Sequence, residues 1–269
     1  MTPIGIGAAL FAILASMIMD HGQPMSLINI PAILLVFGGT IGVSVAGLDK
    51  KDLKTVRKAF KKAMTKAKIA GGPAFVEHLM EAAREARGQG LLALESSLPE
   101  AKTDPFVRTG VELIGLTSDP ERVRSVLDAE IDGMRARHKV GSGFFKNMGG
   151  FAPTVGILGT VIGLIQVLAN LSDPAKLGAA IASAFTATLW GVMSANVFWI
   201  PIYNKLTRRS EEETLYKELV TEGLLALQEG LSGPQLRDRL DPFLSPRDRV
   251  DTKKDAGAAP GVEREESAA

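Results

Sequence analysis

Hydrophobic positions along this chain are gathered into four long blocks that contain no Asp, Glu, Lys, Arg or His. Each block holds roughly 20 mostly apolar residues, about the length that a helix needs to cross the hydrocarbon core of a bilayer. The pattern therefore predicts an all-α membrane protein with four transmembrane helices. The four blocks are residues 1–19, 22–48, 147–172 and 177–204.

The first block has some features of a secretory signal peptide. It has no basic residue before its apolar run, however, and no A-x-A-like cleavage site precedes the second block. We therefore expect it to be a retained helix. Pro31, near the start of the second block, suits the first turn of a helix, where a backbone N–H would lack a helical partner anyway.

Basic residues are distributed very unevenly between the segments that join the blocks. Residues 49–146 carry nineteen Lys and Arg, residues 205–269 carry eleven, and the linker between the first two blocks carries none. The positive-inside rule therefore predicts that the large middle segment and the C-terminus are cytoplasmic. With four spans, the N-terminus is expected on the same side.

The polar segments carry helical periodicity and no strand pattern. The pattern of residues 50–70 predicts a basic amphipathic helix. This helix either lies on anionic lipid headgroups or lies at the rim of an assembly of several chains. Residues 73–98, 104–118 and 120–140 read as a small helical bundle, with a break at Gly88 and Gly90. The expected domains are 1–48 (spans one and two), 49–146 (cytoplasmic helical domain), 147–204 (spans three and four), 205–244 (cytoplasmic helical extension) and 245–269 (disordered tail).

Motifs of enzymes and metal sites are absent from the sequence. There is no cysteine, no Walker loop, no dinucleotide-binding fingerprint and no H-E-x-x-H motif, and the three histidines are scattered among different segments. The formal net charge of +1 gives no argument for binding nucleic acid. We therefore expect no catalytic residues, no metal, no cofactor and no nucleic-acid partner.

Small residues recur at helical spacing in the third and fourth blocks. Gly156, Gly159 or Thr160, and Gly163 form one stripe, and a longer stripe of Ala, Ser, Thr and Gly residues in the fourth block includes Ala187 and Thr188. One interpretation is that the stripes pack the two spans together, because small residues let helices approach closely in lipid. The other is a groove that receives a helix from another chain, with the hydroxyls facing it.

No block contains a carboxylate, so this chain alone offers no proton carrier at membrane depth. Intramembrane ionisable residues are the usual relay elements of proton pathways. If the protein conducts protons, the carrier must therefore come from a partner, and a protonatable partner helix lying against Thr160 and Thr188 would meet that need.

Residues 1 to about 244 resemble the MotA/TolQ/ExbB proton channel family, and in particular its flagellar stator branch, MotA and PomA. The resemblance implies that Pro153 and Pro201 are the family's conformational prolines and that Thr160 and Thr188 flank the partner's carboxylate. As alternatives, Pro153 only starts a helix and Pro201 only kinks one. The match is strongest over residues 143–206, GFFKNMGGFAPTVGILGTVIGLIQVLANLSDPAKLGAAIASAFTATLWGVMSANVFWIPIYNKL.

A second matching stretch, EAAREARGQGLLALE over residues 81–95, is similar to the cytoplasmic signature whose charges touch the rotor. By position it implies that Arg87 and Glu95 are the rotor contacts. As the alternative, both are ordinary solvated charges.

The resemblance also implies an assembly in the bacterial inner membrane. A homo-oligomer, expected to be a pentamer, would surround helices of a MotB-like subunit that carries the essential Asp and binds peptidoglycan, and would push on the rotor protein FliG. The ion path would be lined by Thr160, Thr188, Ala187, Gly156 and Gly163. Sodium-driven relatives tend to have a threonine where this chain has Ala187, so protons are the expected ion and Na⁺ is the alternative.

A TolQ- or ExbB-like energiser of envelope transport is the competing function. It would use the same channel but drive an elongated periplasmic partner. The fourth span and the stretch with Arg87 and Glu95 favour the stator.

Overall fold

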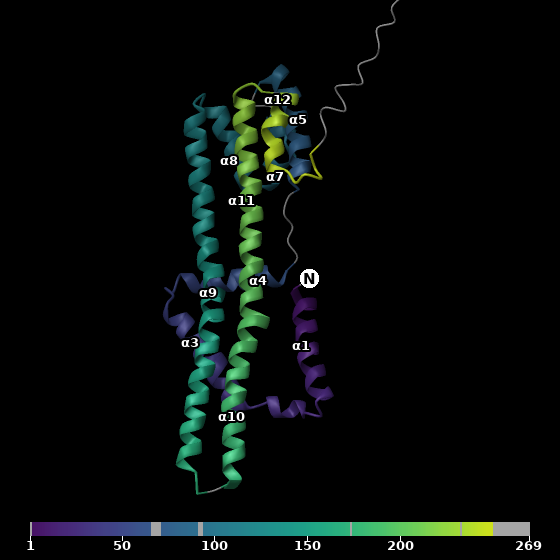
Figure 1. The fold of residues 1–269 in the computed structure, drawn as a ribbon. Helices are drawn as coiled ribbons and strands as arrows, with labels where there is room; N and C mark the ends of the chain where they lie inside the picture. Colours follow the sequence, from purple (N-terminus) through teal and green to yellow (C-terminus); the bar gives the residue numbers. More distant parts are fainter. Residues whose placement is uncertain (1, 66–70, 91–93, 173, 232, 250–269) are drawn as a thin grey trace, which may run out of the picture. The chain divides into compact units, whose positions relative to one another are not determined.

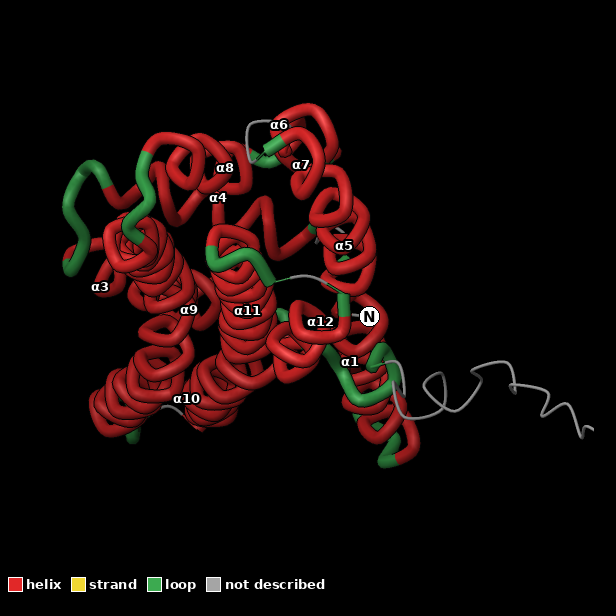
Figure 2. Tube along the Cα trace, turned by 90° about the horizontal axis from the view of Figure 1, so that it is seen from above, coloured by secondary structure: helices red, strands yellow, loops and turns green. Residues whose placement is uncertain are grey.

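The chain is described by a computed structural model in which every regular element is a helix (Figures 1 and 2). The all-α prediction is therefore confirmed over the residues that the structure describes. Packing divides the chain into two compact units, Met1–Ala67 with Gly133–Glu211, and Lys68–Asp132 with Glu212–Ala269. The described residues are 2–65, 71–90, 94–172, 174–231 and 233–249.

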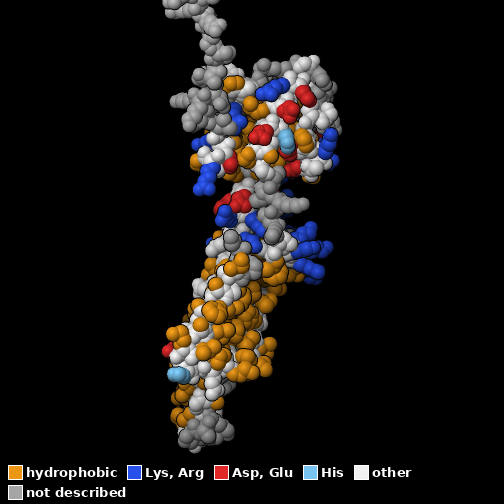
Figure 3. All heavy atoms as spheres, turned by 90° about the vertical axis from the view of Figure 1, so that its right-hand side faces the viewer, with side chains coloured by type: hydrophobic (Ala, Val, Ile, Leu, Met, Phe, Trp, Pro, Cys, Tyr) orange, Lys and Arg blue, Asp and Glu red, His pale blue; other side chains and the backbone are white. Residues whose placement is uncertain are grey.

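The first unit contains the apolar helices. Two helical stretches, Pro120–Ala169 and Leu177–Gln228, are long and apolar enough to cross a membrane, and Ile4–Met19 and Ile30–Ala46 are shorter apolar helices. Hydrophobic side chains cover much of the visible surface of this unit (Figure 3). Its elements are α1 (Thr2–Met19), the 3₁₀ turn η1 (Pro24–Leu27), α2 (Ile30–Ile33), the π-helical turn η2 (Leu34–Gly38), α3 (Gly39–Ala46), α4 (Asp52–Met64), most of α9 (Pro120–Ala169), α10 (Pro174–Met193), the π-helical turn η4 (Ser194–Trp199) and the start of α11 (Ile200–Gln228).

Helix α9 runs without a break through the predicted third span. It joins the predicted helix over 120–140 to the apolar block, and Pro153 lies inside it. The alternative in which Pro153 only starts a helix is therefore wrong. A proline inside a helix removes one hydrogen bond and crowds the carbonyl four residues earlier, which here belongs to Gly149.

The basic helix α4 packs against α9 and α11 through a small apolar cluster. Val56 and Ala63 of α4 are buried in it. Phe60 stacks on Phe145 of α9, with ring centroids 6.0 Å apart and 24° between the planes. The predicted amphipathic helix is therefore present, with a shorter range than 50–70, and residues 66–70 lie outside the described part. The cluster also contains Phe144, Met148, Ile202 and Leu206.

The second unit is a helical bundle with its own core. Phe75 and Tyr216 meet edge to face, with ring centroids 5.9 Å apart. The ammonium of Lys217 lies 3.9 Å from the centroid of the Phe106 ring. The bundle is built from α5 (Gly72–Gln89), α6 (Leu94–Ser97), α7 (Pro99–Thr103), α8 (Pro105–Leu116), the first turns of α9, the last turns of α11, α12 (Pro234–Leu240) and the 3₁₀ turn η5 (Asp241–Phe243).

Local sequence signals explain where two of these helices begin and end. The Asp104 carboxylate accepts a hydrogen bond of 2.9 Å from the N–H of Phe106 and so caps α8. Gly90 ends α5 at a φ of +84°, a conformation that other residues adopt only at a cost. The two glycines of the predicted break, Gly88 and Gly90, thus lie one residue before and one residue after Gln89, the last residue of α5.

The two compact units divide the chain differently from the domains expected from sequence. Those domains follow the expected sides of the membrane, whereas the units follow packing. The basic segment that holds α4 therefore belongs with the apolar helices, and Glu212 onward belongs with the bundle. Of the expected tail, residues 250–269 lie outside the described part of the chain, while Ser245 donates to Asp248 at 2.6 Å.

Candidate ion-path site

Helices α9 and α10 approach each other so closely that side chains are excluded at their contact. A Cβ built on Gly156 would lie 3.0 Å from the carbonyl oxygen of Ala187 and 3.1 Å from the Cα of Gly191. One built on Gly163 would lie 2.6 Å from the Cβ of Ala184. The glycines therefore serve the packing of these two helices, as one of the two interpretations from sequence proposed.

The two threonines lie at this contact with their hydroxyl groups hydrogen-bonded to each other. Thr160 Oγ1 also lies 3.2 Å from the carbonyl oxygen of Ala184 and 3.3 Å from that of Gly156. Thr188 Oγ1 lies 3.5 Å from the same Gly156 carbonyl. Both side chains are only partly buried, so the pair stands at an accessible edge of the contact.

The hydrogen-bond count at this pair determines its chemistry. Each hydroxyl has one proton and two lone pairs. If one hydroxyl donates to the other and the second donates to a helix carbonyl, both protons are used and lone pairs remain free. The pair of Thr160 and Thr188 can therefore accept a hydrogen bond from a protonated carboxylic acid or a water. Neither side chain carries a charge.

The segment from Leu27 to Ala46 also contacts α10 and η4. Trp190 Nε1 of α10 donates to the carbonyl oxygen of Leu27 at 2.8 Å. The Phe37 ring meets Trp190 and Trp199 edge-on, with centroids 5.9 Å and 6.1 Å away. These contacts hold the helix over Ile30–Ala46 against α10 and η4.

The path from α10 into α11 passes through a π-helical turn, Ser194–Trp199, and Pro201 follows two residues later. Proline cannot donate to the carbonyl four residues earlier, and a widened turn accommodates both the lost bond and the ring. A second π-helical turn, Leu34–Gly38, lies in the neighbouring apolar helix.

The predicted ion-path residues therefore lie in two places, the accessible edge of the α9–α10 contact and its buried interior. Thr160 and Thr188 are brought together at the accessible edge, while Gly156, Gly163 and Ala187 are buried between α9 and α10. That these five residues line an ion path stays a prediction.

The two predicted rotor contacts lie in the second unit. Arg87 belongs to α5 and Glu95 to α6, and their side chains lie outside the described part of the structure. Their role as rotor contacts also stays a prediction.

Sequence reasoning missed the two π-helical turns and one buried cation. Pro201 was a signal for a disturbed turn, but nothing in residues 34–38 marked the second one. Arg209 is 8% exposed and donates from its guanidinium to the carbonyl oxygens of Lys62 and Thr65. It thereby satisfies carbonyls in and just after the last turn of α4. Its sequence context of consecutive charges gave no reason to single it out.

Long apolar helices that pack through glycines, with two hydroxyls paired at the edge of the contact, are typical of a helical membrane protein. A family model described as the MotA/TolQ/ExbB proton channel family matches residues 99–219. The motility protein A of Bacillus subtilis is 34% identical over 265 residues, which cover 98% of each chain. The chain belongs to the MotA/TolQ/ExbB proton channel family.

Further similarities lie in the stator branch. The chemotaxis protein PomA of Vibrio alginolyticus is 32% identical over 225 residues, 84% of this chain and 87% of that protein. The flagellar MotAB stator complex from Bacillus subtilis contains a chain that matches with a TM-score of 0.84 and 34% identity, over 91% of this chain and 96% of that one. The C. jejuni MotAB structure matches with a TM-score of 0.83 and 26% identity, over 91% and 95%. The resemblance seen in the sequence is confirmed, and the protein is a stator-type channel subunit, not an enzyme.

Proposed function

We propose that this protein is the ion-conducting stator subunit of a bacterial flagellar motor. The observation that carries the proposal is the hydroxyl pair of Thr160 and Thr188 at the edge of the α9–α10 contact, in a chain that matches motility protein A along nearly its whole length. The pair supplies hydrogen-bond acceptors at membrane depth but no charge.

The membrane arrangement that fits is four spans with both termini in the cytoplasm of the bacterial cell, in its inner membrane. Two long and two shorter apolar helices supply the spans. The distribution of Lys and Arg supports the orientation, because the two segments rich in them would be cytoplasmic.

The missing proton carrier comes from a MotB-like subunit with a single membrane helix, an essential Asp and a peptidoglycan-binding domain. The solved relatives are MotAB complexes, which supports this partner. Several copies of the present chain, in the expected pentamer, would surround two partner helices. Exposed apolar side chains on the spans, such as Phe185 and Ile165, leave surface for neighbouring copies and for lipid.

The partner's Asp, when protonated, can donate a hydrogen bond to the lone pairs of Thr160 or Thr188, and it loses that donor when it ionises. Each elementary charge that crosses 100 mV releases about 2.3 kcal/mol, enough to bias a step of the ring around the anchored partner. Arg87 and Glu95 would pass that step to the rotor protein FliG through short-range charge contacts.

Protons are the coupling ion that the site fits better. A dehydrated Na⁺ needs several oxygen ligands, and the position before Thr188 has none because it is an alanine. Ala187 is 2% exposed, and its methyl group faces Gly159, so a larger side chain there would push on α9. Swimming that persists when K⁺ replaces Na⁺ in the medium would support protons. Swimming that stops without Na⁺ would contradict them.

The decisive experiment is deletion of the gene, followed by swimming assays in soft agar and microscopy of the filaments. We expect paralysed cells with normal filaments, and recovery when the gene is restored. Motile cells with a leaky envelope or poor iron uptake would contradict the stator and favour the TolQ- or ExbB-like alternative.

A further inference from the structure

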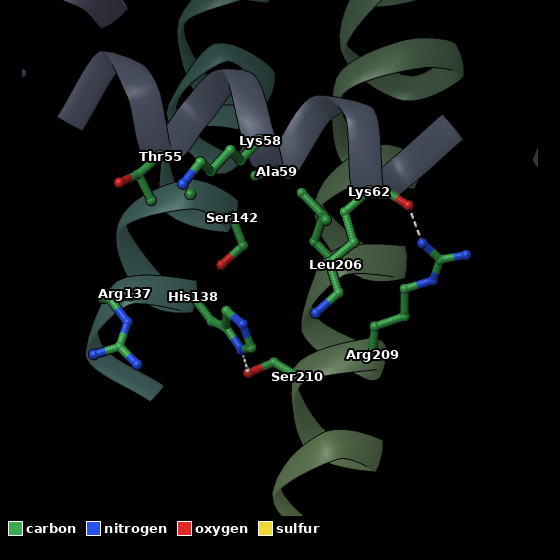
Figure 4. Close-up of a pocket in the computed structure, with 11 residues that line it drawn as sticks. Thr55, Lys58, Ala59, Lys62, Arg137, His138, Ser142, Leu206, Arg209 and Ser210 are labelled. Atoms are coloured by element: carbon green, nitrogen blue, oxygen red, sulfur yellow. Dashed lines mark hydrogen bonds between the residues drawn. The ribbon is translucent and has the colours of Figure 1, made fainter. Parts of the chain in front are cut away.

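A cavity of about 260 Å³ lies in the first unit, between α4, α9 and α11 (Figure 4). It is separate from the candidate ion path. Four basic residues line it, and none of the described residues that line it is Asp or Glu. We call it the basic cavity. The four basic residues are Lys58, Lys62, Arg137 and Arg209.

Hydroxyl groups and an imidazole complete the polar lining. The His138 ring turns from α9 toward Ser210 on α11, and His138 Nδ1 lies 2.9 Å from Ser210 Oγ (Figure 4). Ser142 lines the cavity from α9. Lysine and arginine side chains can only donate hydrogen bonds, and a serine hydroxyl can also donate. The walls of the cavity are therefore rich in donors and positive charge.

Contacts that do not depend on any ligand hold the walls in place. Arg209 fixes the C-terminal end of α4 to α11 through the carbonyl groups of Lys62 and Thr65. At the other side α4 crosses α9 at Gly141, where an added Cβ would lie 2.8 Å from the Cβ of Ala59. The donors thus come from three helices whose mutual positions are already set, which lowers the cost of ordering them around a ligand.

A further lysine lies beside the cavity. Lys205 precedes the lining residue Leu206 in α11. Burial first, and then the charge of Arg209, lower the pKa of the Lys205 ammonium. A bound anion would offset this repulsion between like charges.

We propose that the basic cavity binds a phosphate group, which bridges α4 to α9 and α11. A phosphate has several acceptor oxygens on a small tetrahedral centre, so it can take charge-assisted hydrogen bonds from three sides at once. Its two sources are a phosphorylated solute of the cytoplasm and the headgroup of an anionic lipid.

Depth along the helices favours the solute. His138 lies nine residues before the uncharged block that begins at Asn147, which is roughly 14 Å at the rise of an α-helix. Ser210 lies six residues beyond Asn204, the last residue of the fourth block, which is roughly 9 Å. Both lengths exceed the headgroup layer of about 5–8 Å on each side of a bilayer.

The test is equilibrium binding of radiolabelled inorganic phosphate to the full-length chain in lipid-free detergent. The variant is Lys58→Gln with Arg137→Gln, because both side chains are exposed and line the cavity. Its matched control is Lys61→Gln with Lys139→Gln, which removes the same charge from exposed positions on the same two helices, outside the cavity. We expect saturable binding that weakens about tenfold or more in the first pair and less than about twofold in the control.

A second arm separates the two sources. The same proteins are placed in nanodiscs of phosphatidylcholine with or without phosphatidylglycerol, and retained lipid is counted by native mass spectrometry. Retention of phosphatidylglycerol that is lost only in the cavity pair, without binding of inorganic phosphate, would support the phosphate site and assign it to a headgroup. Absence of saturable binding of either probe, or an equal loss in both pairs, would overturn the proposal.

Discussion

Gly191 of α10 and Gly156 of α9 touch through their backbones. A Cβ built on Gly191 would lie 3.0 Å from the Cα of Gly156 and 2.7 Å from the carbonyl oxygen of Ala152. Both obstacles are main-chain atoms, so no rotamer change can relieve them. This contact sets how near the two threonine-bearing helices lie.

Gly191→Ala is therefore expected to separate α9 from α10 and destabilise the first unit by about 1–3 kcal/mol. The measurement is thermal unfolding of the detergent-purified protein, together with its level in membranes. Gly178→Ala in the same helix is the control, because nothing lies within 4 Å of a Cβ there. Equal stability of the two variants would contradict the close contact.

Thr188→Val keeps the shape of the side chain and removes its hydroxyl. We expect the complex to assemble, with a loss of about 1 kcal/mol or less, because hydrogen bonds between membrane helices are individually weak. We also expect swimming to be abolished, because under the proposed function the partner's carboxylic acid loses one of its two acceptor hydroxyls. Assembly is measured by co-purification with the partner and function by soft-agar swimming.

Thr188→Ser is the control for that variant, since it keeps the hydroxyl and loses only a methyl group. It should swim measurably. Full motility of an assembled Thr188→Val complex would rule out a role for this hydroxyl in the ion path.

Arg209→Gln should free the C-terminal end of α4. The guanidinium donates to two carbonyl groups at that end, and charge-assisted hydrogen bonds contribute about 1.5–3 kcal/mol each when they are buried. Hydrogen exchange over residues 52–65 is expected to accelerate about tenfold or more. Arg208→Gln, at the exposed neighbouring position, should leave the exchange unchanged, and acceleration in both variants would argue against a specific cap.

Glu222 is the centre of an ion-pair network in the second unit. Its carboxylate lies 2.6 Å from Arg124 Nη1 and 3.1 Å from Arg239 Nε. Glu222→Gln should destabilise this unit by about 1–3 kcal/mol, because Arg124 and Arg239 each lose a charged partner, although Arg239 keeps its pair with Glu229 at 2.6 Å. Glu112→Gln, in an exposed pair with Arg108 at 3.9 Å, should have little effect on chemical denaturation. If the network does not contribute to stability, the two variants will have the same midpoint of chemical denaturation.

The same network makes the second unit sensitive to acid. Burial alone would raise the pKa of Glu222, but the hydrogen bonds and charges of Arg124 and then Arg239 outweigh it, so its pKa lies below the ordinary value. Its stabilising contribution is complete above the unfolded pKa of about 4.3 and is lost as pH falls through the lower folded pKa. Stability of Glu222→Gln should therefore depend less on pH below about 4 than that of the original protein. Parallel pH profiles would contradict this.

Much of the fold could be predicted from the sequence, because the sequence signals for helices and helix ends are local. The uncharged block over 147–172 predicts an apolar helix by composition alone. The Asp104 side chain caps the start of α8, and Gly90, which has no side chain, ends α5. The stripe of Gly156, Gly159 and Gly163 follows from helical geometry and predicts a close contact without saying with which helix.

Other features depend on which surfaces meet, and no local signal carries that information. The sequence predicted a helix over 120–140 and a separate apolar block over 147–172, yet α9 is continuous through both. Gly149 within it lies close to α11, since a Cβ there would lie 2.8 Å from Ile200 Cγ1. In the sequence Arg209 is one of several consecutive charged residues, but folding buries it against the C-terminal end of α4.

The sequence by itself determined that this is a helical membrane protein of the proton channel family, with Thr160 and Thr188 as the candidate hydroxyls of the ion path. Composition and periodicity are properties of each segment, so they predict its helices without information on the rest of the chain. Only the tertiary structure decided that Thr160 and Thr188 share a hydrogen bond, that Gly156 meets Gly191, and that four basic side chains surround one cavity. These are contacts between residues far apart in the chain, and packing alone brings them together.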